Sequence, residues 1–410
     1  MSELTFEHTY SSVLSELIRR LQESAPSRIQ LLTGPRQVGK TTLLGPLEAQ
    51  WGDRAIYVAA DVPEAVLPGW WERQWLRARE LAAKAPGAVL LIDEAHVLPD
   101  WSRLLKIETD RLHRENTPLH VVVTGSSALR LSAGSKETMA GRFERLRLMH
   151  WPAAELIGQL GLDKDEAVRL VVTHGSYPGS LKLRFDTRRF RHYLHDSIIE
   201  PAIGRDLVAL ESVRKPALLR QIFAIAAGHP AHVMSLQKIR GSLTDKGSLA
   251  TVAHYLSLLE EACLVVGLKK FSNNMVRQRA APPKLITLNN GLLLSKNEMD
   301  ADTRTIDPAR WGRLVENACA AMAWNSGQNV SYWREEPLEV DFISEGSWGR
   351  FAVEVKTGNY TTRDLQGLLE FQRRYPEFIP LVICDSGNET IAKRMGLPVI
   401  LWEKYLFEGP

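Results

Sequence analysis

The chain has 410 residues, of which 44% are hydrophobic and 24% are charged, and its formal net charge is +3. This length predicts about two to four packed domains, and the mildly basic charge permits a nucleic-acid partner without requiring one. The three cysteines are too few and too scattered for a disulfide framework or a zinc site, and no apolar run reaches the roughly 18 residues of a membrane span. The N-terminus lacks a secretory pattern, so we expect a cytoplasmic protein.

The first motif in the chain is a phosphate loop, GxxxxGKT, within the segment LLTGPRQVGKTTLL. Gly34 and Gly39 let the backbone turn so that successive amides point at phosphate oxygens, and the helix that follows presents its positive N-terminal end to the same anion. We expect Lys40 on the β- and γ-phosphates and Thr41 on Mg²⁺. The motif predicts that ATP or GTP binds along Gly34, Pro35, Arg36, Gln37, Val38, Gly39, Lys40, Thr41 and Thr42.

Apolar runs separated by helical stretches predict a parallel sheet, hence an α/β nucleotide-binding domain over residues 1–150. Ligands of such sheets bind at the carboxyl ends of the strands. The third run ends in Asp93 and Glu94, which we expect to hold Mg²⁺ and to polarise the attacking water. His96, the last letter of DEAH, is expected to pack or to face solvent. The runs are Arg28–Leu32, Ala55–Ala59, Ala88–Ile92 and Leu119–Thr124.

Two further polar residues are candidates for catalysis. Ser126, just after the fourth run, is placed beside the acidic pair and could sense the γ-phosphate or the water; capping a helix is an equally good interpretation. The segment AGRFERLRL predicts a fifth strand with Arg142 directly before it. At the rim of the domain, Arg142 could stabilise transition-state charge in a neighbouring subunit, or it could be an ordinary surface arginine.

The segments GPRQVGKTTLL, LIDEAHVLPDW, VVVTGSSALRLSAG and AGRFERLRLMHWPAAEL resemble prokaryotic AAA+ ATPases that carry a C-terminal domain of unknown function with a restriction-endonuclease-like end. The resemblance covers nearly the whole chain and implies adenine as the base, an arginine finger at Arg142 and a helical lid over residues 151–212. In that lid, HGSYPGS is similar to a turn whose proline packs against the nucleotide, which would be Pro178. The alternative is that HGSYPGS is a plain loop. Further along the chain, Arg205 could be a second cation of the nucleotide site.

The middle segment, residues 213–290, reads as a helix, a short helix, a longer helix and two strands, and it resembles a winged helix. Ser248 is the expected N-cap of the third helix. Such a module often lays this helix in a DNA groove and its wing, here with Arg277 and Arg279, on phosphates. Because the polar face of the third helix has no arginine or lysine, a contact between domains or subunits is the alternative.

After a connector over residues 291–310, residues 311–410 read as a helix with Glu316, followed by two alternating strands that carry Asp341, Glu354 and Lys356. Residues two apart in a strand share a face, so these carboxylates could hold Mg²⁺ against a scissile phosphate while the lysine activates water. The segment resembles the PD-(D/E)xK nucleases, whose pattern falls on Glu316, Asp341, Glu354 and Lys356. The alternative is a structural relic whose acids pair with nearby basic residues.

Two functions follow from these motifs. In the first, ATP hydrolysis with Mg²⁺ drives action on DNA by a homo-oligomer whose winged helix and nuclease-like end hold or cut the DNA. In the second, ATP binding controls assembly with protein partners, and the nuclease-like end is inactive. The candidate catalytic residues for ATP hydrolysis are Lys40, Glu94, Ser126 and Arg142.

Overall fold

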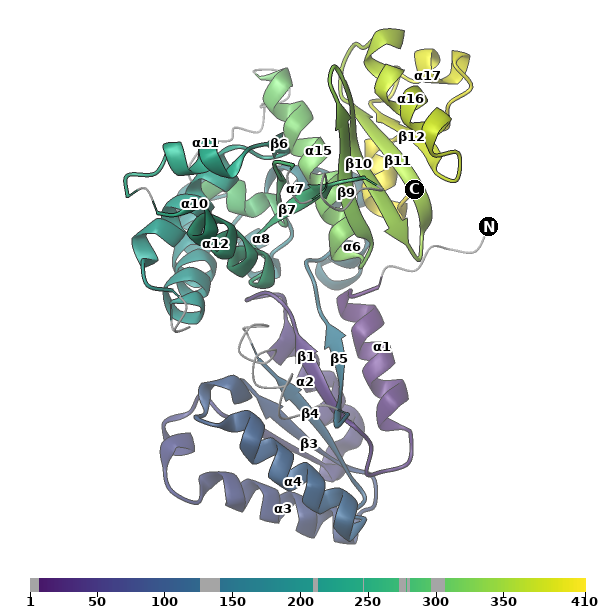
Figure 1. The fold of residues 1–410 in the computed structure, drawn as a ribbon. Helices are drawn as coiled ribbons and strands as arrows, with labels where there is room; N and C mark the ends of the chain where they lie inside the picture. Colours follow the sequence, from purple (N-terminus) through teal and green to yellow (C-terminus); the bar gives the residue numbers. More distant parts are fainter. Residues whose placement is uncertain are drawn as a thin grey trace. The chain divides into compact units, whose positions relative to one another are not determined.

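The structure, a computed structural model, describes residues 7–125, 141–208, 213–245, 247–272, 278, 281–295 and 307–410. The chain forms two compact units, residues Glu7–Met149 and the chain from His150 to Pro410. Figure 1 shows the helices and strands of both. The candidate residues Ser126, Arg277 and Arg279 lie outside the described residues. The boundaries that the sequence predicts inside the second unit stay predictions.

The first unit is built on a five-stranded sheet in the order β2-β3-β4-β1-β5, and every neighbouring pair is parallel. The parallel α/β fold predicted from the apolar runs is thereby confirmed. Because β4 lies between β1 and β3, the carboxyl ends of these three strands meet at one edge of the sheet. The strands are β1 (Ile29–Thr33), β2 (Ala55–Ala59), β3 (Ala88–Asp93), β4 (Leu119–Thr124) and β5 (Phe143–Arg147).

Helices cover this sheet, and β1, β3 and β4 are buried along their whole length. Such strands read as near-continuous apolar runs, which explains why they could be found in the sequence. Helices α3 and α4 pack one face through a cluster that includes Trp75 and Trp101. The helices are α1 (Tyr10–Leu21), α2 (Lys40–Trp51), α3 (Trp70–Lys84) and α4 (Trp101–Glu115), with short 3-10 turns at Gly52–Arg54, Pro63–Val66 and Ala95–Val97.

The second unit contains an eight-stranded sheet in the order β13-β12-β11-β10-β9-β7-β8-β6. Strand β7 pairs in parallel with β9 through Lys269 with Ser331 and Lys270 with Tyr332, so one sheet runs from the middle segment into the C-terminal segment. The sequence pattern did not predict this connection. The strands are β6 (His232–Val233), β7 (Val265–Lys270), β8 (Lys284–Thr287), β9 (Asn329–Glu335), β10 (Leu338–Gly346), β11 (Gly349–Lys356), β12 (Ile379–Cys384) and β13 (Val399–Leu401).

The middle segment has the predicted helices α10, α11 and α12 and the predicted strands β7 and β8 in that order. The short strand β6 between α10 and α11 was not predicted, and β8 pairs with both β6 and β7. The Ser248 side chain accepts the N-capping hydrogen bond from the Thr251 amide, as predicted. The assignment to the winged-helix class stays a prediction. The helices are α10 (Pro216–Gly228), α11 (Leu236–Gly241) and α12 (Leu249–Glu261).

The other helices of this unit precede and follow the middle segment. Before it lie α6 (Ala153–Leu160), α7 (Lys164–Thr173), α8 (Pro178–Leu181), α9 (Thr187–Tyr193) and two π-helical turns, Leu194–Ile199 and Pro201–Leu207. After it come a 3-10 turn at Asn290–Ser295, α15 (Pro308–Asn325), a 3-10 turn at Thr362–Leu365, α16 (Gln366–Arg374), α17 (Thr390–Arg394) and α18 (Trp402–Glu408). The predicted hairpin is present, since β10 and β11 are antiparallel.

Candidate nucleotide site and C-terminal acidic cluster

The phosphate loop connects β1 to α2 and is tightly curled. Gly34 has φ +152° and Gly39, the N-cap of α2, has φ +96°, so both lie outside the range that a side chain favours. A Cβ atom added to Gly34 would stand 1.9 Å from the carbonyl oxygen of Leu148, so only glycine fits there. The loop and the first turn of α2 therefore form a backbone cradle of the kind that binds phosphate.

Lys40 lies over this cradle. Its side chain is buried, and the ammonium donates hydrogen bonds to the carbonyl oxygens of Gly34 at 3.1 Å and Pro35 at 2.6 Å. Thr41 and Thr42 are exposed in the first turn of α2. The cation is thus positioned at the loop, where the sequence motif needs it.

Asp93, at the end of β3, is held on both carboxylate oxygens. The Thr124 hydroxyl at the end of β4 donates to Oδ1, and the Tyr57 hydroxyl from β2 donates to Oδ2 at 3.1 Å. Burial and the Asp93 charge raise the pKa of Tyr57 above its ordinary value. Thr124 ends the fourth predicted run, whose end was expected beside the acidic pair. The role of Tyr57 was not predicted, because it depends on which strands are neighbours.

Glu94 follows with a backbone φ of +52°, a left-handed conformation that is rare for a residue with a side chain. Its amide donates to the Thr124 hydroxyl oxygen at 3.2 Å, so one threonine side chain contacts both members of the acidic pair. Oε2 of Glu94 lies 3.2 Å from Nδ1 of His96, which is buried. His96 packs, as predicted, but the sequence did not indicate that it faces the carboxylate expected to act on water.

Arg142 lies at the other edge of the sheet. Its carbonyl accepts from the Ile29 amide at the start of β1, and its guanidinium pairs with Asp110 of α4 at 2.5 and 3.3 Å. The hydrogen bond to Arg142 lowers the pKa of Asp110. Five residues of β1, roughly 15 Å at about 3.3 Å per residue, separate this edge from the phosphate loop. Arg142 therefore does not act on the loop of its own chain, and its role in a neighbouring chain stays a prediction.

The HGSYPGS turn is packed within the second unit. Gly175 has φ +73°, and a Cβ atom there would stand 1.9 Å from Oδ1 of Asn289. The same Oδ1 accepts from the Ser176 amide at 3.3 Å, and Pro178 begins α8. Arg205 is an exposed residue of the π-helical turn Pro201–Leu207. The expected contacts of Pro178 and Arg205 with a nucleotide stay predictions.

The second group of predicted residues is brought together at the β10–β11 hairpin. Asp341 accepts from the Val355 amide at 2.8 Å, and Glu354 accepts from the Asp341 amide at 3.3 Å. The Lys356 ammonium donates to Glu354 at 2.6 Å. Glu316 projects from α15 toward the same place, where it and Asp341 both face the ammonium of Lys284. We call Glu316, Glu339, Asp341 and Glu354 the acidic cluster.

Lys284 of β8 stands inside the acidic cluster, and the sequence analysis missed it. Its side chain is 1% exposed. The ammonium lies 2.5 Å from Glu316 and 3.5 Å from both Glu339 and Asp341, and it donates to the Asp341 carbonyl oxygen at 2.9 Å. The available signal was a single lysine at the head of the apolar run KLITL.

Burial and the Asp341 charge raise the pKa of both Glu316 and Glu354 to about 8. Burial alone would lower the pKa of Lys284, but the facing carboxylates outweigh it and raise the pKa above its ordinary value. Across the part of the chain that the structure describes, no three acidic, histidine or cysteine side chains are arranged to hold a metal ion. The Mg²⁺ site predicted for the nuclease-like end was based on two carboxylates, and it stays a prediction.

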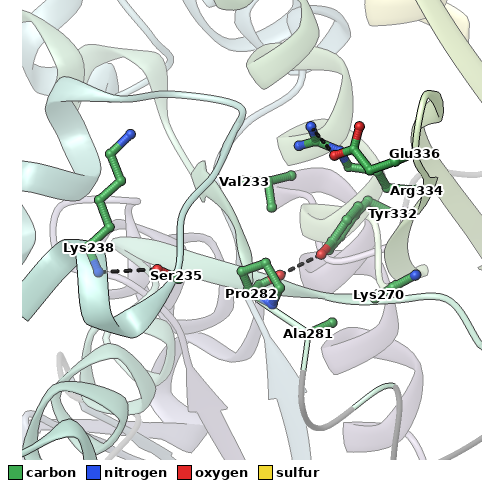
Figure 2. A pocket seen from close by; sticks show the side chains of 9 residues that line it. All are labelled: Val233, Ser235, Lys238, Lys270, Ala281, Pro282, Tyr332, Arg334 and Glu336. Atoms are coloured by element: carbon green, nitrogen blue, oxygen red, sulfur yellow. Dashed lines mark hydrogen bonds and ion pairs between the residues drawn. The ribbon is translucent and has the colours of Figure 1, made fainter.

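An open pocket of about 620 Å³ lies where the middle and C-terminal segments share their sheet. Three cations from three elements line it: Lys238 of α11, Lys270 of β7 and Arg334 of β9 (Figure 2). Arg334 pairs with Glu336 at 2.7 Å, whereas neither lysine has an ion pair with any described residue. The pocket therefore carries excess positive charge. Its remaining lining residues are Val233, Ser235, Ala281, Pro282 and Tyr332.

Comparison with protein families divides the chain into three matched segments. Residues 26–157 match an AAA domain, residues 165–303 match one domain of unknown function, and residues 311–405 match another. The segment that matches an AAA domain contains the phosphate loop and the parallel sheet of the first unit. None of the helices in the described ranges is long and apolar enough to cross a membrane.

Individual relatives add little about function. Uncharacterized proteins of Mycobacterium bovis and Mycobacterium tuberculosis are each 27% identical over 349 residues, which cover 83% of this chain and 72% of theirs. The Aeropyrum pernix Orc1 protein in complex with DNA is 17% identical with a TM-score of 0.32, covering 75% of this chain and 95% of that one. AMPPCP-bound DnaA from Aquifex aeolicus is 16% identical with a TM-score of 0.32, covering 63% and 92%. TM-scores this low carry no functional argument.

Proposed function

We propose that the AAA domain hydrolyses ATP at its phosphate loop. The observation that supports this most directly is the convergence of Lys40, buried over the curled loop, with Asp93 and Glu94 at the end of β3. Gly34 leaves a cradle that a side chain would fill. Among the described residues, each oxygen of Asp93 accepts one hydrogen bond from a hydroxyl, and a carboxylate oxygen can accept a second one. These residues fit a nucleotide with its magnesium ion.

Each residue has a distinct task in this proposal. The loop amides and Lys40 would bind the phosphates, and Thr41 with Asp93 would hold Mg²⁺, which neutralises phosphate charge when bound. Glu94 would accept the hydrogen bond of the attacking water and orient it. Thr124 would fix Asp93 and Glu94 relative to each other, because it contacts both.

The proposal is tested by ATP binding and phosphate release in two variants. Lys40→Ala should lose ATP binding, whereas Glu94→Gln should keep it and hydrolyse at least about a hundredfold more slowly, because only the positioning of water is lost. A Glu94→Gln protein that turned ATP over at the wild-type rate would refute the assigned role. Absence of saturable ATP binding by the wild-type protein would refute the site.

We further propose that DNA is the partner and that the pocket of Figure 2 contacts its phosphates. The support is the excess positive charge of Lys238 and Lys270, neither of which has an ion pair with another described residue. The exposed polar face of α12, the helix first considered for this contact, offers no arginine or lysine. Phosphate contacts supply most non-specific affinity, so binding should weaken steeply with salt.

Binding of a short duplex at several salt concentrations tests the DNA partner. In the double variant Lys238→Ala/Lys270→Ala, the slope of log affinity against log salt concentration should become shallower by about 1.8. Each neutralised phosphate contributes about 0.9 to that slope. Lys269→Ala is the matched control, because Lys269 is exposed next to Lys270 but does not line the pocket. An unchanged slope in the double variant would place the contact elsewhere.

The second candidate function, an ATP-controlled switch for protein partners with an inactive nuclease-like end, is favoured by one observation. Lys284 stands among the carboxylates that a nuclease would use for Mg²⁺. If the wild-type protein hydrolyses ATP but shows neither salt-sensitive DNA binding nor cleavage of duplex DNA with Mg²⁺, the switch replaces the DNA-acting function.

A further inference from the structure

The Lys284 ammonium makes the contacts that a small cation would make in the acidic cluster. It has three hydrogen atoms to donate, and it faces Glu316 from α15, the carbonyl of Asp341 from β10, and the side chains of Glu339 and Asp341 at longer range. Carboxylate and carbonyl oxygens are also the ligands that hard divalent cations use. The ammonium and a metal ion would therefore compete for the same oxygens.

Lys284 is fixed in this position by the fold. It is the first residue of β8, a strand that pairs with β7 on one side and β6 on the other. The side chain is 1% exposed, so it has no path to solvent without moving the strand. A divalent ion within a few ångströms of a buried ammonium would meet strong repulsion, because the interaction of like charges is poorly screened in a protein interior.

The charges in the acidic cluster are countered by side chains of the protein itself. Lys284 and Lys356 supply two positive charges against four carboxyl groups. Arg334 supplies a third positive charge, 3.6 Å from Glu339. Side chains of the protein therefore already counter most of the negative charge of the acidic cluster.

We infer that Lys284 is the built-in cation of the acidic cluster, that it takes the place a divalent metal would need, and that the C-terminal fold of this chain therefore binds no catalytic metal and does not cleave nucleic acid. Lys284 comes from the segment matched by one domain of unknown function, while the acids come from the segment matched by the other. The inference is independent of ATP hydrolysis by the first unit.

Uptake of Mn²⁺ by the full chain without nucleotide tests this, measured by calorimetry and by the loss of the free-ion paramagnetic resonance signal. The wild-type protein and Asp341→Asn should show the same Mn²⁺ binding, because the cluster takes none in either. Lys284→Met removes the charge and keeps most of the volume, so it should gain a site at least about tenfold tighter than any in the wild type. Asp341→Asn in that background should remove the gained site.

Lys356→Met is the matched control, since Lys356 contacts Glu354 at the edge of the same cluster but does not fill its centre. It should gain much less Mn²⁺ affinity than Lys284→Met. A wild-type Mn²⁺ site that Asp341→Asn abolishes, or Mn²⁺-dependent cleavage of duplex DNA lost in the same variant, would overturn the inference. A folded Lys284→Met protein that gains no Mn²⁺ site would overturn it too. If that variant does not fold, the comparison of wild type with Asp341→Asn still decides.

Discussion

At the scale of single residues, Thr124 connects the two acids of the nucleotide site. Its buried hydroxyl donates to Asp93 and accepts from the amide of Glu94. Through Asp93 it also belongs to a chain of hydrogen bonds that ends at Tyr57. Because Glu94 holds a left-handed backbone conformation, a contact that fixes its amide is well placed to maintain it.

Thr124→Val should therefore be costly although it conserves shape. The variant removes the acceptor of the Glu94 amide and the hydroxyl donor to Oδ1 of Asp93, which should lower the free energy of unfolding of the first unit by about 1–3 kcal/mol. ATP turnover should fall as well, because both acids lose a fixed position. Urea denaturation and phosphate release measure the two effects. Thr124→Ser, which keeps the hydroxyl, is the control; a Thr124→Val protein as stable and as active as the wild type would show that the hydroxyl contacts contribute little.

At the scale of helices and strands, the sequence predicted what is local and missed what depends on pairing. The strands β2 and β4 have the predicted bounds. For β4 the reason is that a buried parallel strand is a compact apolar run. The two-residue period of a strand predicted that the side chains of Asp341, Glu354 and Lys356 lie close together, and they do so in the structure. The parallel pairing of β7 with β9 places Lys284 in the acidic cluster, and nothing in the local spacing of either strand indicates that pairing.

The turn before α8 offers a test of close packing at this scale. Gly175→Ala places a Cβ atom 1.9 Å from Asn289 at a positive φ, whereas Gly161→Ala has a similar φ of +67° with nothing within 4 Å. Both should lose roughly 1–2 kcal/mol of stability from backbone strain, and Gly175→Ala should lose more because Asn289 must move. Denaturation of the second unit, followed by hydrogen exchange of its peptides, gives the difference. An equal loss of stability in the two variants would show that Asn289 moves aside at no cost in free energy.

At the scale of the whole molecule, the second unit should depend on pH through its acidic cluster. Glu316 and Glu354 have pKa values raised to about 8, so the folded state holds protons that the unfolded state releases. Their stabilising contribution is fully present below the ordinary pKa of about 4.5 and is lost as pH rises through about 8. Hydrogen exchange of β10 and β11 should therefore accelerate over that range.

Glu354→Gln mimics the protonated carboxyl group and should make this acceleration smaller. The comparison with wild type is needed because burial lowers the pKa of His174 in the same unit, which adds stability as pH rises and opposes the trend. An identical pH dependence in wild type and Glu354→Gln would show that Glu354 is already ionised at neutral pH.

Assembly into an oligomer is the last property that the geometry lets us test, because Arg142 lies at the edge of the sheet opposite the phosphate loop of its own chain. If Arg142 completes the site of a neighbouring chain, Arg142→Ala should lower turnover by about a thousandfold or more, as the loss of an arginine finger does. Asp110→Asn, which removes the partner of Arg142 and leaves the guanidinium, should retain turnover and so controls for loss of the ion pair.

Turnover per subunit should rise with protein concentration. A mixture of Arg142→Ala with Lys40→Ala subunits should recover activity, since each supplies what the other lacks, and no recovery at any ratio would exclude a shared site.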